Sequence, residues 1–191
     1  MVVGLTGGIG SGKTTVLHLF KEFNVATYIA DKEAKQLMNS SSVIKEKLIK
    51  EFGEDVYKNN QLNRVYLAEI VFKNKEKLAI LNSIVHPEVY KHLDNFIKEN
   101  SDKDYVVYEN AILFENGSDV LCDKIITVTA PINIRIQRVI TRDNTTKEEV
   151  IKRINNQWFE EKKILQSNYI VENIELKNTQ ESVRKIHNFL T

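Results

Sequence analysis

The chain of 191 residues, 42% of them hydrophobic and 28% charged, suits a single domain with a buried core. Its 27 basic and 26 acidic residues give a net charge of +1, which argues against a nucleic-acid-binding protein. One cysteine cannot form an internal disulfide, and no apolar run approaches the roughly 18 residues that span a bilayer. We therefore expect a cytoplasmic protein with no signal peptide and no membrane or nucleic-acid partner.

The first residues predict a strand, a glycine-rich loop and a helix. Met1–Leu5 is short and apolar, as in a central strand, and apolar residues recur at helical spacing from Val16 to Phe23. Five of the seven glycines lie within the first twelve residues. Because glycine permits positive φ and close approach to the backbone, the chain needs those properties at this loop.

Strand and helix patterns then alternate. Residues 32–100 are helical, with Gly53 as a stop signal and Pro87 expected to open a helix. Further strands are predicted at 25–30, 105–108, 124–129 and 169–171. The alternation predicts an α/β fold with a parallel sheet covered by helices.

Two later segments carry weaker signals. Residues 144–168 are polar, and little in them fixes their position. Asn178 and Glu181 resemble a capping box, before a last helix whose apolar stripe is Val183, Ile186 and Leu190. Pro131 is expected to start the helix before the polar segment.

Residues 7–14 match the phosphate-loop pattern G-x-x-x-x-G-K-[ST] in full. Backbone N–H groups of such a loop cradle phosphate oxygens, helped by the positive end of the following helix. Lys13 can reach the β- and γ-phosphates, and the Thr14 hydroxyl can bind Mg²⁺. A chance match would not be expected to fall between a predicted strand and a predicted helix, as this one does.

The loop indicates a nucleotide but not a reaction. A GTPase would normally carry N-K-x-D, and the nearest string, residues 74–77, lacks the aspartate. A small-molecule kinase fits the length and the inserted helical block. The alternatives are a kinase for another small acceptor and a nucleotide-dependent switch with a protein partner.

Two carboxylates follow predicted strands, where ligands bind in open α/β sheets. Asp31 could accept the proton of the acceptor hydroxyl or hold a water of the magnesium shell, or it could simply cap a helix. Glu109 could support the metal through water, or face solvent.

Arg135, Arg138 and Arg142 are spaced to share one helix face, and Arg153 follows in the polar segment. Converging guanidinium groups could form a lid over ATP and stabilise the transferring phosphoryl group. A solvated basic face is the alternative. A lone histidine such as His86 is more often structural, and Cys122 is expected to be a packing residue.

Residues 4–15, which read Gly-Leu-Thr-Gly-Gly-Ile-Gly-Ser-Gly-Lys-Thr-Thr, closely resemble the opening of dephospho-CoA kinases. Further matches follow in order and cover nearly the whole chain: Ala30-Asp31, Ala34-Lys35, Asn63-Arg64, Leu67, Val71-Phe72, Leu81, Ile84, His86-Pro87, Ile112-Leu113-Phe114-Glu115, Arg138, Arg142-Asp143, Arg153, Gln157 and Asn173.

The resemblance implies phosphorylation of the ribose 3′-hydroxyl of dephospho-CoA by ATP with Mg²⁺, in a monomer or weak oligomer. It implies a nucleoside-monophosphate-kinase-like core (1–31 and 104–191), a helical substrate lobe (32–103) and a lid (about 143–167). Catalysis would fall to Asp31, Lys13 and Arg142, and acceptor binding to Asp31, Arg64, His86 and Glu115. The implied ATP-binding residues are Gly8, Gly10, Ser11, Gly12, Lys13, Thr14, Thr15, Arg138, Arg142 and Asn173.

The chain departs from the family pattern at four places. Ile29 replaces the first of two aspartates, which leaves the base role to Asp31 alone. Ala111 replaces a proline, Arg135 stands where glutamine is common, and Asn168 stands where aspartate is common.

Overall fold

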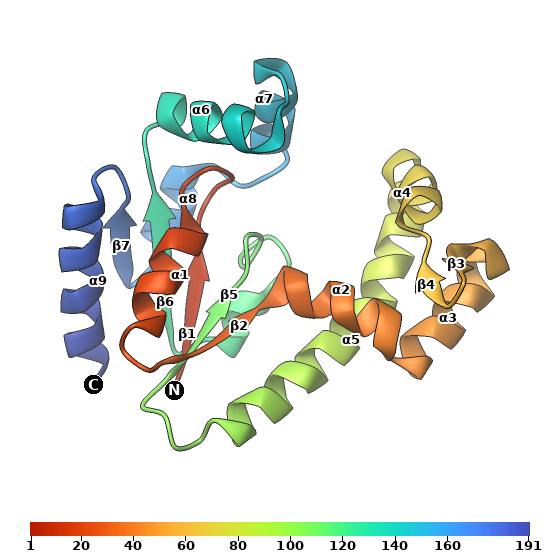
Figure 1. Ribbon diagram of the computed structural model, residues 1–191, viewed down its shortest axis with the longest axis horizontal. Coiled ribbons are helices and arrows are strands. Elements are labelled where there is room, and N and C mark those ends of the chain that lie inside the picture. The colour runs from red at the N-terminus through yellow and green to blue at the C-terminus, as the bar shows by residue number, and fades with distance from the viewer. The chain divides into compact units, whose positions relative to one another are not determined.

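The computed structural model describes residues 1–191, except for the side chain of Lys73. The chain divides into two compact units. The first combines Met1–Tyr28 with Glu99–Thr191, and the second is Ile29–Lys98, coloured orange to yellow-green in Figure 1. The sequence patterns put the borders of the inserted block a few residues later, at 31/32 and 103/104.

The first unit is built on a five-stranded sheet in the order β2-β5-β1-β6-β7. Its strands are β1 (Val2–Thr6), β2 (Ala26–Ile29), β5 (Val106–Glu109), β6 (Lys124–Thr129) and β7 (Tyr169–Glu172). β1 is buried throughout and pairs in parallel with β5 and β6, and β6 pairs in parallel with β7. The predicted α/β class with a parallel sheet is confirmed.

The first unit also contains helices, which are α1 (Lys13–Lys21), η2 (Ser118–Leu121), α6 (Ile132–Asp143), α7 (Lys147–Asn155), α8 (Glu160–Leu165) and α9 (Leu176–Leu190). Contacts with the sheet are made by α1, η2, α8 and α9, whereas α7 packs against α6. Contacts join α1 to α9, α9 to β7 and α8 to β6 (Figure 1). Val16 and Phe20 of α1 are buried, as expected from their helical spacing.

The second unit is mainly helical. It comprises α2 (Ala30–Ser40), α3 (Ser42–Phe52), η1 (Glu54–Val56), α4 (Arg64–Lys73) and α5 (Lys75–Glu99), with an antiparallel hairpin of β3 (Tyr57–Lys58) and β4 (Gln61–Leu62). Asn59 and Asn60 turn the hairpin with positive φ. Ile44, Leu48 and Val56 are fully buried. No helix among the described residues is both long and apolar enough to cross a membrane.

Two local predictions were wrong. Pro87 lies inside α5 rather than at the start of a helix. The apolar residues before and after it, including Ile84, Val85 and Val89, are buried along one helix, and this packing outweighs the local cost of proline.

The polar segment, whose residues carry no clear signal, is partly helical, and the second error concerns the start of the last helix. Residues 144–168 contain α7 and α8, and the Thr146 side chain caps α7 by accepting a hydrogen bond from the Glu149 N–H at 3.3 Å. Asn178 does not cap α9, which already begins at Leu176, so the capping-box pattern lies inside the helix. The predicted stripe is nevertheless used, because Val183 and Ile186 are buried.

Cys122 packs beneath β1, where a methyl group added at Gly4 would lie 2.8 Å from its Sγ. Burial, followed by the charges of Asp119 and Asp123, raises the pKa of the thiol from 9.0 to about 12. We expect Cys122 to react with a disulfide reagent at pH 8 roughly a thousandfold more slowly in the native protein than in denaturant, because so little thiolate forms. Absorbance of the released thiol measures both rates, and equal rates would contradict the burial.

Candidate functional site

The phosphate loop, residues 7–14, connects β1 to α1. Gly12 is the N-cap of α1 with φ 92°, a left-handed conformation that disfavours residues with a Cβ. A methyl group there would also overlap the Asn173 side-chain amide. Position 12 must therefore be glycine for two separate reasons. Its backbone is left-handed, and Asn173, the residue after β7, occupies the space that a side chain would need.

Lys13 folds back over this loop, and its Nζ donates a hydrogen bond to the Gly7 carbonyl at 2.8 Å. Burial is the largest effect on its pKa and lowers it; Glu109 acts in the opposite direction, and Lys163, Arg135 and Arg142 lower it further. Because Lys13 is buried among other cations, its charged form is stabilised when an anion such as phosphate binds nearby. The electrostatics of the loop therefore favour phosphate binding.

Thr14 and Thr15 are exposed in the first turn of α1, which contains no acidic side chain. The unneutralised positive end of the helix favours anions there. Thr14 follows Lys13 in the chain, and Glu109 at the end of β5 is close enough to influence the Lys13 pKa. Hydroxyl and carboxylate oxygens are hard ligands that suit Mg²⁺.

Arg138 and Asn173 converge on the C-terminal part of the loop. The Asn173 amide donates to the Ser11 carbonyl at 2.9 Å, and its oxygen accepts from the Thr179 hydroxyl at 3.1 Å. Arg138 donates to the carbonyls of Ser11 at 3.4 Å and Asn173 at 3.0 Å. The structure therefore brings both predicted residues to the loop, where they bind its carbonyl groups.

Arg142 lies at the exposed end of α6. It makes an ion pair with Asp143 at 2.7 Å, and Arg153 binds the same carboxylate at 2.7 Å. The hydrogen bond from Arg142 is the main cause that lowers the Asp143 pKa to about 2, so this carboxylate stays charged across the physiological range. The predicted arginine face is thus divided: Arg142 is exposed, whereas Arg135 is only 5% exposed.

Glu115, predicted to bind substrate, is engaged by the protein itself. Its Oε1 lies 2.7 Å from the ammonium of Lys163, which is fully buried, and accepts the Trp158 N–H at 2.9 Å. Its Oε2 is buried without a hydrogen-bond partner among the described residues. Sequence reasoning missed Lys163 because nothing in a polar helix indicates which lysine is buried.

The second unit carries the other predicted acceptor residues. Asp31 lies in the first turn of α2, with its side chain 87% exposed and 3.3 Å from the Lys35 ammonium. It is not the N-cap, which is Ile29. His86 is half-buried in α5, and burial lowers its pKa, so it is neutral at pH 7.

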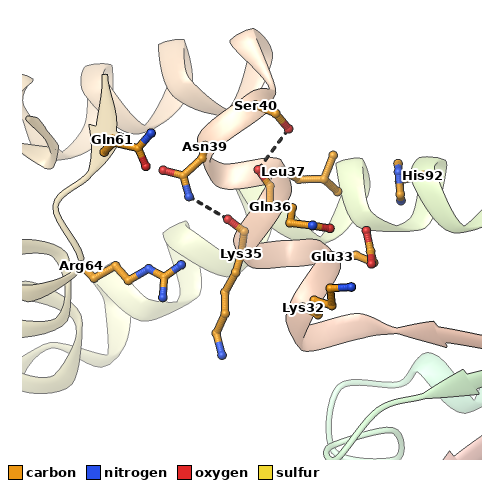
Figure 2. Close-up of a pocket in the computed structure, with 10 residues that line it drawn as sticks. All are labelled: Lys32, Glu33, Lys35, Gln36, Leu37, Asn39, Ser40, Gln61, Arg64 and His92. Carbon is orange, nitrogen blue, oxygen red and sulfur yellow. Dashed lines mark hydrogen bonds between the residues drawn. The ribbon is translucent and has the colours of Figure 1, made fainter. Parts of the chain in front are cut away.

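Arg64 begins α4 and lines a cavity of about 670 Å³ in this unit. Figure 2 shows the cavity between α2, the β4 region and α5, with polar and basic side chains around it. Its lining residues are Lys32, Glu33, Lys35, Gln36, Leu37, Asn39, Ser40, Gln61, Arg64 and His92. Three cations against one carboxylate make this cavity suitable for an anionic group.

Comparisons with known proteins agree with this geometry. A family model described as dephospho-CoA kinase matches residues 1–178. The dephospho-CoA kinase of Fusobacterium nucleatum is 37% identical over 190 residues, covering 99% of this chain and 96% of that protein.

Two solved structures are also similar over the whole chain. A protein from Thermus thermophilus is 30% identical with a TM-score of 0.86, covering 100% of this chain and 98% of that one. A dephospho-CoA kinase from Campylobacter jejuni is 27% identical with a TM-score of 0.72, covering 98% and 96%.

Asn173→Asp tests the hydrogen bond between Asn173, which follows β7, and the Ser11 carbonyl of the loop. The substitution replaces a buried donor with an acceptor facing the Ser11 carbonyl, so we expect a loss of roughly 1–3 kcal/mol in the free energy of unfolding. Denaturant titration measures it. Asn95→Asp on the exposed surface of α5 is the matched control and should change stability little; equal effects of the two substitutions would contradict the assignment.

Proposed function

Because the chain belongs to the dephospho-CoA kinase family, which phosphorylates dephospho-CoA with ATP in the last step of coenzyme A biosynthesis, we propose roles for its residues in that reaction. The 3′-hydroxyl oxygen of the ribose attacks the γ-phosphorus, the bond to the β-phosphate oxygen breaks, and ADP leaves. The phosphate loop with its partly buried Lys13 is the observation that carries this proposal.

On the ATP side, the phosphates bind at the loop residues Gly8, Gly10, Ser11, Gly12, Lys13, Thr14 and Thr15, and the Lys13 ammonium leaves the Gly7 carbonyl to bind them. This exchange is favourable because a phosphate oxygen is a stronger acceptor than a carbonyl. Arg142 follows the transferring group once Asp143 releases it, and Arg138 with Asn173 supports the loop from behind. These positions stabilise charge that spreads over the phosphoryl oxygens in the transition state.

Mg²⁺ is the proposed metal. The Thr14 hydroxyl would bind it directly and Glu109 would bind it through water, and the ion would neutralise phosphate charge when bound. The exposure of Thr14, which follows Lys13 in the sequence, and the proximity of the Glu109 carboxylate to Lys13 support this assignment.

On the acceptor side, Asp31 orients the attacking hydroxyl and accepts its proton. In a loose phosphoryl-transfer transition state, proton transfer itself contributes little to the rate. Most of the contribution of the carboxylate therefore comes from positioning the attacking hydroxyl. Arg64 and the basic cavity beside it would hold anionic groups of dephospho-CoA. The family resemblance also assigns His86 and Glu115 to the acceptor, although the Glu115 carboxylate is engaged by Lys163 and Trp158.

The protein would act in the cytoplasm as a monomer or weak oligomer, with small molecules as partners. The single cysteine suits a reducing compartment, and the net charge of +1 gives no reason to expect nucleic acid as a partner.

The test of the proposal is ADP formation from MgATP, measured with and without dephospho-CoA. We expect strong stimulation by the acceptor, a product heavier by one phosphoryl group in mass spectrometry, and loss of activity in Lys13→Met. Stimulation only by another nucleotide or nucleoside would point to a different acceptor. Slow hydrolysis that no acceptor changes would instead support a switch.

Asp31→Asn separates the acceptor role from nucleotide binding. The substitution keeps the size of the side chain but removes its charge, so kcat should fall by about a hundredfold or more while the Kd for ATP changes by less than about threefold. Calorimetry with ATP alone gives the Kd. If ATP binding weakens as much as turnover, Asp31 serves the metal or the fold instead.

A further inference from the structure

The tip of the phosphate loop is held through both backbone polar groups of one residue, Ile9. The Ile9 N–H donates to the Gln157 side-chain oxygen at 2.8 Å, and the Ile9 carbonyl accepts from Arg135 Nε at 3.0 Å. Both partners lie more than 120 residues away in the chain, on α6 and in the segment before α8. This contact is additional to the bonds that Asn173 and Arg138 make with the other end of the loop.

Arg135 is fitted closely into the loop. A methyl group added at Gly8 would overlap its guanidinium group, so the absence of a side chain at Gly8 makes space for the arginine. The Arg135 side chain is 6% exposed and its NH1 lies 3.1 Å from the Glu160 carboxylate. A guanidinium buried to this extent requires such a partner, because an unpaired buried charge is strongly unfavourable.

Glu160 is itself on a fixed helix. Lys163, one turn further along α8, is fully buried and donates to the Ala111 carbonyl at 3.1 Å in addition to its ion pair with Glu115. Trp158 precedes the helix, and its ring stacks on Phe114 at 5.9 Å with an interplanar angle of 3°. The beginning of α8 is therefore anchored to the 111–115 segment, and it can hold Glu160 in a defined place.

We propose that Arg135 and Glu160 form a positioning pair, which together with Gln157 holds the backbone at Ile9 in the loop conformation that receives the ATP phosphates. The proposal extends the function proposed above, since it assigns residues of the ATP side that act through the loop backbone and not by contact with the acceptor. It also divides the expected lid into two parts. Residues 157–163 support the loop, whereas the exposed end of α6 and α7 form the part that can move when ATP binds.

The proposal predicts a particular kinetic pattern. If the loop loses its support, the KM for ATP should rise about tenfold and kcat should fall, whereas the KM for dephospho-CoA should stay within about twofold. A merely structural pair would lower the melting temperature and the fraction of active protein without changing either KM.

The experiment compares full-length Arg135→Met, Arg135→Lys, Glu160→Gln and the double variant R135M/E160Q with the wild type. The double variant is the important one, because removing both charges avoids leaving the partly buried Glu160 carboxylate without a partner and should restore much of the stability. It still lacks the hydrogen bond to Ile9. We therefore expect weak ATP binding at near-native melting temperature, with partial recovery in Arg135→Lys, which keeps the charge but not the fork of donors.

ATP binding is measured by calorimetry without acceptor, so the outcome does not depend on whether dephospho-CoA is the substrate. Arg184→Met on the exposed surface of α9 is the matched control and should bind ATP like the wild type. Gln157→Leu removes the support from the amide side and should weaken ATP binding as well. Wild-type Kd values for ATP in R135M/E160Q and Gln157→Leu would overturn the proposal.

Discussion

Positive charge is concentrated at the phosphate loop before any phosphate arrives, and the surrounding structure depends on keeping it there. Lys13, Arg135 and Lys163 are close enough for the latter two to lower the Lys13 pKa, and Lys163 is completely buried. Like charges in a region of low dielectric repel one another, so each needs a partner. Glu109 acts on Lys13, Glu160 pairs with Arg135, and Glu115 pairs with Lys163.

The same constraint explains the composition of the loop. Glycines leave the backbone amides accessible, but they also leave room for groups that approach the loop from the protein side. Gly8 and Gly10 lie against Arg135, and Gly12 lies against Asn173. The bare backbone thus serves packing on one side and phosphate binding on the other.

The extent to which this could be predicted depends on the range of the signals. Local apolar patterns and a glycine motif indicate the strand–loop–helix unit of residues 1–23 and the parallel sheet, so both could be predicted. Pro87 inside α5 and the helices within 144–168 were not, because packing decided the first, and α7 and α8 are short helices with few apolar residues among many charged ones. Asn173 at the loop was found through resemblance alone, whereas Arg138 was also indicated by its spacing on one helix face.

Arg135, Glu160 and Lys163 could not be found in that way, since their roles arise from burial between segments far apart in the chain. A sequence shows that a lysine or an arginine is present, but only the packed structure shows that it is without water. The spacing of Arg135, Arg138 and Arg142 suggested one common face, yet the first is covered and the last is exposed.

The chain has a single tryptophan, and it is Trp158, located between the Gln157 contact to the loop and the buried Lys163. Its ring is stacked on Phe114, and the Lys162 ammonium lies 3.2 Å from the ring centre. Indole emission depends on such neighbours, so all tryptophan fluorescence of this protein originates at the anchor of the loop. The unlabelled enzyme therefore carries its own optical probe at the place where nucleotide binding and the 157–163 segment meet.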